Sequence, residues 1–578
     1  MIIGIDLGTT NSLGAIMTPD GPRIIPNALG DTLTPSVVGV DQDGAILVGR
    51  EAQEYQVVQP ERCASVFKRH MGSSWSVKLG ETKFSPIELS SLILKSIKAD
   101  AEQHLGETVT DAVITVPAYF NEPQRKATMQ AGQIAGLSVL RIINEPTAAA
   151  ITYGLQDIDR ERVALVFDLG GGTFDVSVVD QFDGALEIRS SAGETFLGGE
   201  DFTRTMALRV CQKIGRVFEH VELEHPLLLA RLCGECERAK RLLTDKEVAS
   251  IRIPNDAGEI QPDGQVVEVT RQDVEAWTEH ILARIELPIR RALGDAKLTR
   301  EDLDQVILVG GATRMPRVID RVRDLFGQEP KRDLDPDEVI ALGAAVQAGL
   351  IDRNESLDDL VVTDVAPFTL GVEIVRPVGG QERAGYFLPL IHRNTTIPVS
   401  RVETVGTTVA NQTEVVVRMF QGESRRVEGN LLLGEFTVRG IPRGPAGQPI
   451  ELRFTYDLNG VLQVEATVSA TKQTTSHVVT RHAGDLTDEQ IAAAVKRMEE
   501  LKVHPREDAE NRTLLRRSER LFAELPMEER QQLDSILSGF EDALELQDDA
   551  AIESNRELLK RFLDAVSPSG DFDEGKDD

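Results

Sequence analysis

Cysteine is scarce in this chain, whose 578 residues include only four, at Cys63, Cys211, Cys233 and Cys236. So few cysteines exclude a disulfide scaffold for a chain of this length. Cys233 and Cys236 form a C-x-x-C pair, but neither a second pair nor a nearby histidine pair completes a metal site. The surrounding sequence LLLARLCGECERAKRLL has helical periodicity, so we interpret these cysteines as helix-packing thiols.

Positive charge is also in short supply. Lysine and arginine together number 63 against 94 aspartates and glutamates, which gives a formal net charge of −31. Proteins that bind nucleic acid or anionic membranes usually carry a surplus of positive charge. We therefore expect no nucleic acid and no membrane among the partners of this chain.

Long apolar runs are missing as well. No window reaches the ~18 uncharged apolar residues of a membrane-spanning helix. The first residues, MIIGIDLGTTNSLGAIM, lack a basic region, and Asp6 interrupts their apolar stretch, so they do not resemble a secretory signal. These features predict a cytoplasmic protein.

The chain does contain a succession of differently patterned regions. At ~150 residues per domain, its length predicts about four globular units. Residues 1–357 alternate short β-rich runs, such as 163–169 and 305–311, with helical stretches such as 85–105 and 270–293. This alternation is typical of an α/β domain.

A repeated sequence pattern, which we call the internal echo, divides the α/β region into two halves. The sequence IDLGTTN at 5–11 resembles FDLGGGT at 167–173. Each is an apolar strand that ends in an aspartate, followed by a turn of glycine and threonine and a second β-like stretch. The simplest interpretation is two similar lobes, each of which contributes one loop to a central cleft.

Four shorter segments follow the α/β region. The sequence DDLVVTD at 358–364 is a short apolar run flanked by acids, which predicts an interdomain linker. Residues 365–484 lose the helical period and predict an all-β module, with Asn459-Gly460 as a hairpin turn. Residues 485–566 are again helical in pattern, and the acidic residues 567–578 predict a disordered tail.

The two aspartate–glycine turns have the composition of phosphate-binding loops. Glycine lets the backbone approach an anion closely, and successive N–H groups form an anion-binding concavity. Asp6 or Asp168 beside the phosphates could hold Mg²⁺ directly or through its waters. A third turn, Gly310-Gly311, could pass close to a base or ribose. The sequence contains no Walker-type G-x-x-x-x-G-K-[ST] motif, so a P-loop is excluded.

Asp41-Gln42-Asp43-Gly44 resembles the start of a calcium-binding loop. It lies between two β-like runs and lacks the downstream glutamate of such loops. We therefore predict a hairpin turn at this position.

Seven motifs along the chain together resemble the DnaK-type, or seventy-kilodalton heat-shock, chaperones. In order, they are GIDLGTTNS, VITVPAYFNEPQRKAT, INEPTAAAITYG, FDLGGGTFDVSV, FLGGEDF, CERAKR and LVGGATRMP. The resemblance continues through the linker, the β module (NTTIP, QGE, DLNGVL) and the helical segment. It implies a multidomain fold with an actin-like α/β two-lobed ATPase domain, a β-sandwich peptide-binding domain and an α-helical lid. The compact linker and C-terminal region resemble the specialised HscC-like branch.

The resemblance implies a chaperone that hydrolyses ATP to ADP with Mg²⁺ and binds extended apolar segments of unfolded or specific client polypeptides. It also implies stimulation by a J-domain co-chaperone, and it leaves open whether a nucleotide exchange factor is needed. The implied catalytic residues are Lys68, Glu145, Asp175 and Thr173, and the implied Mg²⁺ residues are Asp6 and Asp168. The implied nucleotide contacts are Thr9, Thr10, Asn11, Gly170, Gly171, Gly172, Glu237, Lys240, Arg241, Thr244, Gly310, Gly311, Arg314 and Asp337.

Coupling between the domains is also implied by position. Pro117 and Arg125 match the family's switch elements, and Arg141, Asn144 and Asp364 match positions where a J-domain co-chaperone docks. The implied peptide-lining residues are Val372, Ile374, Val375, Thr408, Val415 and Val417. The helices that follow, up to about residue 566, would form the lid that slows peptide release.

Two departures from the family pattern affect these expectations. Thr363 stands in the linker where the family usually has a leucine, which predicts weaker apolar docking of the linker. Val375 and Thr408 differ from the residues common in general DnaK proteins, which allows a narrower set of clients.

Plainer interpretations exist for each of these residues when it is taken alone. The valines of the β module would be sheet core, Lys68 a surface lysine and Glu145 a helix-capping acid. Two other protein classes share a two-lobed ATPase fold, namely filament-forming actin-like proteins and sugar kinases. The long β and helical regions after Val362 argue against both.

Overall fold

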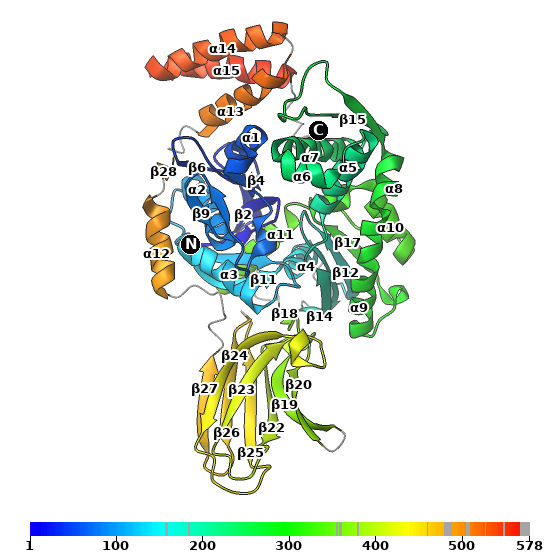
Figure 1. Ribbon diagram of the computed structural model, residues 1–578, viewed down its shortest axis with the longest axis vertical. Helices are drawn as coiled ribbons and strands as arrows, with labels where there is room; N and C mark the ends of the chain where they lie inside the picture. The colour runs from blue at the N-terminus through cyan, green and yellow to red at the C-terminus, as the bar shows by residue number, and fades with distance from the viewer. Residues whose placement is uncertain are drawn as a thin grey trace.

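The computed structural model arranges the chain as a two-lobed α/β domain, a β module and a set of helices (Figure 1). It describes residues 1–578 except 157–159, 183–184, 354–356, 358–360, 379–380, 459, 479–487, 501, 504–508, 526, 547–548 and 567–578. The segment predicted as a disordered tail, part of the predicted linker and Asn459 of the predicted hairpin therefore lie outside the described residues.

The first lobe is built on a mixed sheet with the strand order β11-β10-β1-β2-β3 and with β4 paired to β2. The strands are β1 (Ile2–Asp6), β2 (Asn11–Thr18), β3 (Gly21–Ile25), β4 (Thr34–Pro35), β10 (Asp111–Val116) and β11 (Ser138–Asn144). β1 and β2 form an antiparallel hairpin, and β10 runs parallel to β1. The turn between β1 and β2 is the first aspartate–glycine turn.

The second lobe repeats this arrangement in the sheet β17-β12-β13-β14-β18-β21. Its strands include β12 (Arg162–Leu169), β13 (Phe174–Phe182), β14 (Ala185–Glu194) and β17 (Gln305–Val309). β12 and β13 form the antiparallel hairpin, and β17 runs parallel to β12. The structure thus agrees with the internal echo, because each aspartate–glycine turn joins the first two strands of a similar sheet.

Helices cover both sheets, and their ends follow local capping chemistry. The first-lobe helices are α1 (Arg50–Val58), α2 (Pro86–Leu105) and α3 (Glu122–Ile134). The second-lobe and inter-lobe helices are α4 (Glu145–Gln156), α5 (Gly199–Lys213), α6 (Phe218–Glu224), α7 (Pro226–Leu242), α8 (Arg271–Leu282), α9 (Glu286–Ala296), α10 (Pro316–Phe326) and α11 (Val339–Ile351). α2 begins at a capping box in which Ser85 and Glu88 each accept a backbone N–H bond, and it ends at Gly106, whose φ is 69°.

Small strands complete the first lobe. They are β5 (Val38–Val40), β6 (Ala45–Val48), β7 (Cys63–Ala64), β8 (Val77–Leu79) and β9 (Thr82–Phe84), while β15 (Val248–Arg252) and β16 (Val266–Thr270) form a hairpin in the second lobe. The turn Asp41–Gly44 joins β5 to β6, and the Asp41 carboxylate accepts bonds from the Asp43 and Ala45 backbone N–H groups. The prediction of a hairpin turn there is confirmed.

The predicted linker is a strand in the structure. β18 (Val361–Val365) pairs in parallel with β14 of the second lobe and antiparallel with β21 (Thr396–Ile397) of the β module. The linker is therefore hydrogen-bonded into the sheet of the second lobe.

The β module consists of two four-stranded sheets, β20-β19-β23-β24 and β22-β25-β26-β27. The strands are β19 (Leu370–Val378), β20 (Gln381–Ile391), β22 (Val399–Gly406), β23 (Glu414–Gln421), β24 (Leu431–Arg439), β25 (Pro449–Tyr456), β26 (Leu462–Val468) and β27 (Gln473–Val478). Alternate residues of both sheets form one apolar core that includes Phe454 and Val464. β25 and β26 form the hairpin that the Asn-Gly pair predicts, and Gly460 has a φ of 81°.

The C-terminal helices are α12 (Asp488–Glu500), α13 (Ala509–Glu524), α14 (Met527–Leu546) and α15 (Asp549–Val566), with the short strand β28 (Lys502–Val503) between the first two. α12 packs on α3, α13 packs on α1, and β28 pairs with β6, so the first lobe holds these elements. In Figure 1 they lie beside and beyond the first lobe, away from the β module. The expectation of a lid over the peptide site is therefore not the arrangement seen here.

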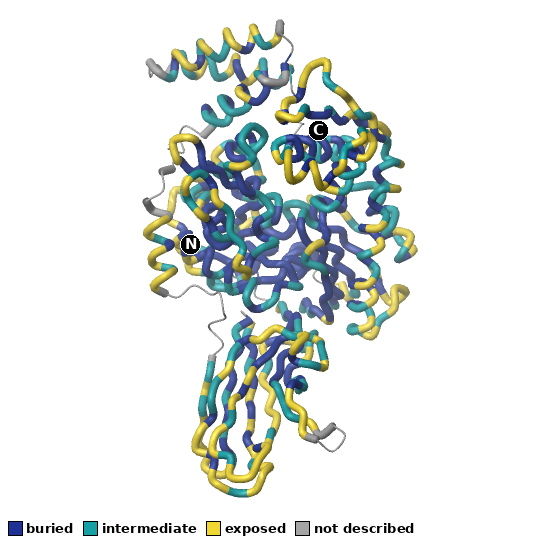
Figure 2. The backbone as a smooth tube through the Cα atoms, viewed as in Figure 1, coloured by how far each residue is buried: buried dark blue, intermediate teal, exposed yellow. Residues whose placement is uncertain are grey.

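Burial is concentrated at the centre of the two lobes, as Figure 2 shows, whereas the β module and the C-terminal helices expose more of their surface. Separate apolar clusters fill the first lobe, the second lobe and the β module. Among the described residues, no helix has the length and apolar character needed to cross a membrane.

Candidate functional site

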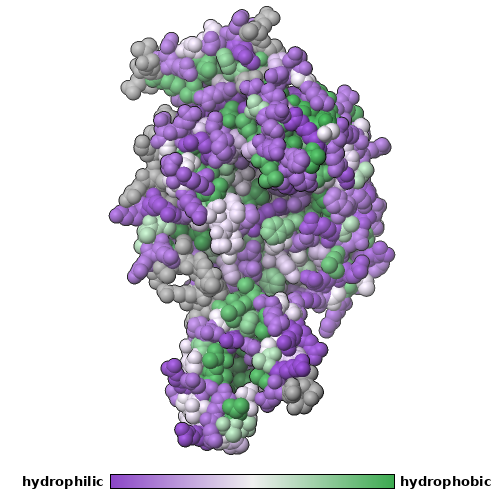
Figure 3. All heavy atoms as spheres, in the orientation of Figure 1, coloured by the Kyte–Doolittle hydropathy of each residue, from purple (hydrophilic) through white to green (hydrophobic). Residues whose placement is uncertain are grey.

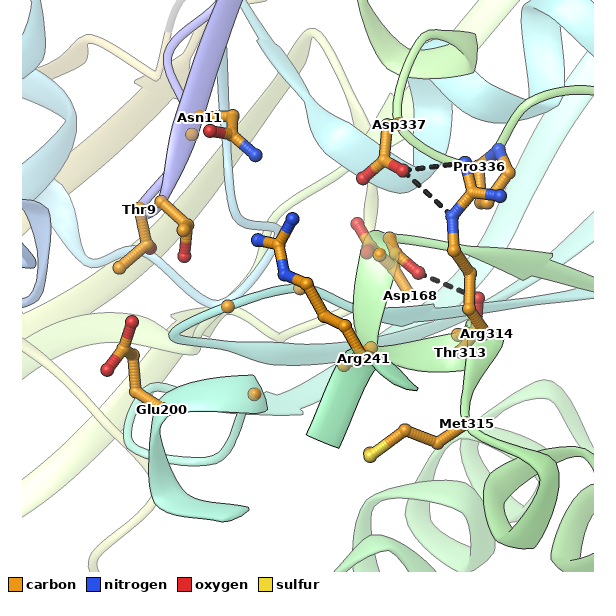
Figure 4. A pocket seen from close by; sticks show the side chains of 18 of the residues that line it. Thr9, Asn11, Asp168, Glu200, Arg241, Thr313, Arg314, Met315, Pro336 and Asp337 are labelled. Atoms are coloured by element: carbon orange, nitrogen blue, oxygen red, sulfur yellow. Dashed lines mark hydrogen bonds and ion pairs between the residues drawn. The ribbon is translucent and has the colours of Figure 1, made fainter. Parts of the chain in front are cut away.

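A cavity of about 690 Å³ opens between the two lobes, where the turns after β1, β12 and β17 meet. Most of the residues that the sequence predicts for a nucleotide site line it. They are Asp6, Thr9, Thr10, Asn11, Lys68, Glu145, Asp168, Gly170, Gly171, Thr173, Glu237, Lys240, Arg241, Thr244, Gly310, Gly311, Arg314 and Asp337. Figure 4 shows several of these side chains facing the cavity from different elements.

The two aspartate–glycine turns fit closely against each other, which explains their glycines. A Cβ atom at Gly171 would lie 1.8 Å from Thr10 Oγ1, and one at Gly172 would lie 2.6 Å from Thr9 Oγ1. The Thr10 hydroxyl is buried and has no hydrogen-bond partner among the described residues. These turns therefore bring backbone and hydroxyl donors together at one place, as phosphate binding requires.

Four carboxyl groups are buried at the base of the cavity, of which Asp6, Glu145 and Asp168 line it and Asp175 lies beside it. Burial raises the pKa of Asp6 to about 7 and that of Asp175 to about 8, and it raises the pKa of Asp168 well above its ordinary value. The carboxylate of Glu145 adds to each of these shifts by like-charge repulsion. The Asp168 Oδ2 atom is buried without a hydrogen-bond partner among the described residues. This concentration of acids, in excess of the nearby positive charge, is suited to a divalent cation.

Lys68 is the cation closest to these acids. It lies on the 3-10 helix η2 (Phe67–His70), and its ammonium group donates to Glu145 Oε1 at 2.6 Å. The side chains of Lys68 and Glu145 are 4% and 8% exposed, so the pair is buried. A lysine held in this way can place positive charge beside an anion in the cavity.

The opposite side of the cavity is formed by α7 and by the turns before α10 and α11. Glu237 accepts bonds from Lys240 at 2.6 Å and from Arg241 at 3.0 Å. Arg314 donates to Asp337 at 2.8 Å and to Asp335 at 2.8 Å, and Figure 4 shows the bond from Arg314 to Asp337. Glu237, Lys240 and Arg241 are thus paired along one helix, and the three residues also line the cavity.

Gly172 and Asp175 are predicted site residues that do not line the cavity and lie beside it. The carbonyl oxygen of Gly172 accepts a bond from Arg69 Nε at 2.9 Å. Asp175 accepts a bond from the Tyr119 backbone N–H at 3.1 Å.

Sequence reasoning missed a second charged pair at the cavity. Arg69 donates to Asp201 at 2.5 Å, and Asp201 also accepts a bond from the Gly198 N–H at the start of α5. Glu200 lines the cavity next to this pair. The motif FLGGEDF marks Glu200 and Asp201 as acids at a helix start, but it does not indicate that Arg69 is the partner of Asp201.

A buried path of an ion pair, a peptide bond and hydrogen bonds joins the cavity to the linker strand. Glu145, which pairs with Lys68, directly follows Asn144, and Asn144 Nδ2 donates to both carboxylate oxygens of Asp364 at 2.9 Å. Arg125 donates to Asn144 Oδ1 at 2.5 Å and to the carbonyl oxygens of Ala118 and Phe120. The predicted coupling residues Arg125, Asn144 and Asp364 are therefore in contact.

The remaining two coupling residues lie close by. Pro117 is buried at the end of β10. Arg141 lies on β11, where burial lowers its pKa and the Asp364 carboxylate raises it. The structure thus brings four of the five predicted coupling residues, Arg125, Arg141, Asn144 and Asp364, together at β18, and Pro117 lies next to Ala118, whose carbonyl oxygen accepts a bond from Arg125.

The β module docks on the two-lobed domain through a few specific contacts. The rings of Tyr119 and Phe368 lie 4.6 Å apart. Asp295 of α9 accepts bonds from Arg393 at 2.8 and 2.9 Å and from Asn394 at 2.8 Å. Because Tyr119 also bonds to Asp175, one contact path leads from the acids of the cavity to the β module.

The predicted peptide-lining residues differ in exposure. Val372 and Val417 are buried in the core of the module, whereas Ile374, Val375 and Val415 are only partly buried. Thr408 is exposed on the segment between β22 and β23. The plainer interpretation as sheet core therefore describes Val372 and Val417 better than the other four.

The cysteines have the surroundings expected of packing residues. Cys233 and Cys236 lie on α7 within an apolar cluster, and Cys211 belongs to the same cluster. Burial raises the pKa of the Cys233 thiol to about 12. Within the described part of the chain, no group of three or more histidine, cysteine, aspartate or glutamate side chains forms a complete metal site, so a cation at the acids of the cavity would also need oxygen ligands from phosphate or water.

The fold and the cavity define a two-lobed nucleotide-binding ATPase domain joined to a β module. Comparison with known proteins refines this class. Residues 2–568 match the family model described as Hsp70 protein. The chain is 42% identical to the chaperone protein DnaK of Thermotoga neapolitana, across 88% of this chain and 85% of the relative. It is 39% identical to DnaK of Thermosipho melanesiensis, across 97% of this chain and 95% of the relative.

The chain therefore belongs to the Hsp70 family. Proteins of this family are ATP-hydrolysing chaperones that bind ATP and ADP with Mg²⁺ and bind client polypeptides. This assignment argues against the two alternative classes, a filament-forming actin-like protein and a sugar kinase.

Proposed function

We propose that this chain is a chaperone in which the nucleotide in the inter-lobe cavity controls peptide binding by the β module. The observation that carries the proposal is the buried path from Lys68 and Glu145 through Asn144 to Asp364 of the linker strand. A change in charge at the cavity has a direct contact route to the linker through these residues.

The residues of the cavity fit a magnesium nucleotide. In our proposal the turns at Thr9–Asn11 and Gly170–Thr173 bind the phosphates, and Asp6 and Asp168 hold Mg²⁺, directly or through its waters. The unpartnered Asp168 oxygen and Thr10 hydroxyl support this assignment, because both are buried polar atoms without a partner among the described residues. Mg²⁺ would neutralise phosphate charge and orient the γ-phosphate.

Hydrolysis then depends mainly on positioning and charge. Lys68 supplies positive charge beside the γ-phosphate, and Glu145 holds the lysine in place. Thr173 ends the second turn and Asp175 lies at the start of β13, so a hydroxyl and a carboxylate are available there to orient the attacking water. Glu237, Lys240, Arg241, Thr244, Gly310, Gly311, Arg314 and Asp337 form the adenosine side.

The finer assignments belong to the same proposal. Val372, Ile374, Val375, Thr408, Val415 and Val417 contact an extended peptide, and the C-terminal helices form the lid in another state of the cycle. A J-domain co-chaperone docks at Arg141, Asn144 and Asp364, and the protein acts in the cytoplasm on unfolded or specific clients. The compact linker and C-terminal region support membership of the HscC-like branch.

The test measures the binding of a fluorescent, leucine-rich extended peptide with ADP and then with ATP. We expect stable binding with ADP and rapid release with ATP. Lys68→Ala should lower the ATP hydrolysis rate by about 10²–10³-fold, because it removes a buried charge next to the phosphates. It should still bind ATP and should remain in the peptide-releasing state.

Lys78→Ala is the matched control, since Lys78 is an exposed first-lobe lysine paired with Glu81. This variant should hydrolyse ATP and release peptide like the unmodified chain. A peptide that stays bound with ATP, or that binds with neither nucleotide, would contradict the proposed coupling.

A further inference from the structure

The β module carries a cluster of arginines around one tyrosine, in a chain whose net charge is −31. The guanidinium of Arg426 lies 4.4 Å from the centre of the Tyr386 ring, and those of Arg376 and Arg425 each lie 5.9 Å from it. Arg383 stands directly opposite Arg376 in the pairing of β19 with β20. We call these four arginines and Tyr386 the arginine cluster.

The backbone holds this cluster together. Tyr386 forms a bridge with Arg426, and the Phe387 N–H donates to the carbonyl oxygen of Arg425 at 3.1 Å. Gly385 has a φ of 86°, and a Cβ atom there would lie 3.2 Å from Arg426 Nη2. A glycine at this position therefore leaves room for the guanidinium, so the cluster is a defined feature of the fold.

The positive charge of the cluster is largely uncompensated. Arg376, Arg383 and Arg425 are exposed. Among the described residues, no ion pair joins any of these three arginines to an acid. Arg426 is 3.7 Å from Glu428, an exposed carboxylate. Like charges opposite each other destabilise a strand pair, so the Arg376–Arg383 pairing has a cost that the sheet itself does not offset.

Other arginines of the same module are neutralised by acids. Arg418 pairs with Glu373 at 3.2 Å and with Glu435 at 3.0 Å. Arg453 lies 3.8 Å from Glu465. The arginine cluster therefore differs from the ordinary ion-paired surface of the module.

The cluster adjoins the proposed peptide site. Ile374, a proposed peptide contact, pairs directly with Tyr386 across the two strands, and Arg376 follows Val375 by one residue. Figure 1 shows β19 and β20 extending together along one edge of the module, and Figure 3 shows hydrophilic residues along that edge. A peptide bound at Ile374 would thus have its flanking side chains next to the arginines.

We propose that the arginine cluster binds acidic side chains that flank the apolar core of a bound peptide, so that the chain prefers acidic clients. Guanidinium groups bind carboxylates through paired hydrogen bonds, and the tyrosine ring fixes their planes by stacking. This inference rests on the proposed function, because it assigns a substrate class to the same peptide site.

The experiment compares three labelled peptides that share one leucine-rich core and are flanked by glutamates, serines or lysines. Their dissociation constants are measured with ADP at low and high salt. We expect the glutamate-flanked peptide to bind about tenfold more tightly than the lysine-flanked peptide at low salt. The preference should shrink at high salt, because these charges are exposed.

The variant R376Q/R383Q/R425Q should lose this preference and keep the affinity for the serine-flanked peptide. R401Q is the matched control, since Arg401 is an exposed arginine on β22 in the other sheet, and it should keep the preference. Equal or tighter binding of the lysine-flanked peptide by the unmodified chain would overturn the inference without any variant.

Three further outcomes also overturn the inference, and they separate its failure from that of the proposed function. If the serine-flanked peptide binds with ADP and leaves with ATP but the flanks make no difference, only the acidic preference fails. If no peptide binds, the proposed function fails and the inference fails with it. Binding of phosphatidylserine vesicles that the triple variant loses, without any flank preference, would assign the cluster to a lipid surface instead.

Discussion

Asp175 is a carboxylic acid that burial keeps protonated near neutral pH. Its pKa is raised to about 8, first by loss of water and then by repulsion from Glu145. The Tyr119 N–H bond and the Lys68 charge oppose this shift without reversing it. A cation bound in the cavity would lower the pKa of Asp175 and favour its ionised form, so the protonation of Asp175 is linked to cation binding.

The stability of the nucleotide-free protein should report this protonation. The folded pKa of Asp175, about 8, lies above the unfolded value of 3.8, so the unfolded chain binds fewer protons between these pH values. The buried Asp175 carboxyl group therefore destabilises the fold least below pH 3.8, where it is protonated in both states. This stability is lost progressively as the pH rises from 3.8 through about 8. In Asp175→Asn the free energy of unfolding should fall less steeply with pH over this range than in the unmodified chain. The two slopes should differ by up to about 1.4 kcal/mol per pH unit.

Urea unfolding followed by tryptophan fluorescence measures this difference, because Trp75 and Trp277 both lie in the ATPase domain. Asparagine can still accept the Tyr119 N–H bond, so the substitution changes the charge and keeps the contact. Asp324→Asn, at an exposed position of α10, is the control. Identical pH slopes for Asp175→Asn and the unmodified chain would contradict the raised pKa.

Many residues of the cavity could be predicted from the sequence, because short local motifs indicate them. An apolar strand that ends in aspartate and continues into glycine and threonine shows itself within a few residues, as at Asp6 and Asp168. The bond between Arg69 and Asp201 joins residues 132 positions apart and has no such local pattern. Only the fold brings the two together, so sequence reasoning missed the pair.

Among the elements, the linker strand β18 shows a mismatch between a side chain and its surroundings. The Thr363 hydroxyl is buried and has no hydrogen-bond partner among the described residues, while the backbone of the same residue pairs with Glu187 of β14. An unsatisfied buried hydroxyl has a free-energy cost. The prediction that Thr363 weakens docking of the linker therefore has a physical basis in the structure.

Thr363→Val should strengthen the docked linker. Valine has nearly the same shape as threonine without the hydroxyl, so docking should gain about 1–2 kcal/mol. Hydrogen exchange of the backbone amides of β18 measures this gain as slower exchange. Thr396→Val, at an exposed position on the adjacent strand β21, should leave the exchange rate unchanged. Unchanged or faster exchange in Thr363→Val would show that the hydroxyl has no cost.

Element types were easier to predict than element partners. Alternation and the Asn-Gly pair indicate the hairpin of β25 and β26, because both signals are local. The strand β28 is two residues long and pairs with β6, more than 450 residues earlier in the chain. The linker gave a similar result: its apolar run predicted docking, but strand pairing with β14 depends on an edge that only the folded second lobe provides.

At the scale of the whole molecule, a row of arginines fastens the helical region to the first lobe. Arg512, Arg516 and Arg520 recur every four residues and therefore share one face of α13. They lie against Glu51 at 3.0 Å, Asp41 at 3.8 Å and Glu54 at 2.8 Å, respectively. Arg516 also lies over the Tyr55 ring at 4.8 Å. Ion pairs therefore contribute to the contact of α13 with the first lobe, whereas α12 contributes apolar contacts through Ile491, Ala494 and Val495. The strength of the α13 contact should depend on salt and on single charges.

The pair of Arg520 and Glu54 tests whether this row holds the helices on the ATPase domain. Both side chains are nearly buried, 7% and 5% exposed, so removing one partner leaves the other as an uncompensated charge. Arg520→Ala and Glu54→Ala should each weaken docking of α13 by about 3–5 kcal/mol. The double variant should lose much less than the sum of the two, because neither charge then remains.

Hydrogen exchange of α1 and α13 in the full chain measures docking in each variant. Arg517→Ala is a control on the same helix, since Arg517 pairs with Asp564 of α15 inside the helical region, at 2.8 Å. That variant should loosen α15 and leave α1 protected, because its partner does not belong to the first lobe. If Arg517→Ala exposes α1 as much as Arg520→Ala does, then general loosening of the helices, and not the ionic row, controls their attachment. If only Arg520→Ala and Glu54→Ala expose α1, this row sets how readily the helices leave the ATPase domain.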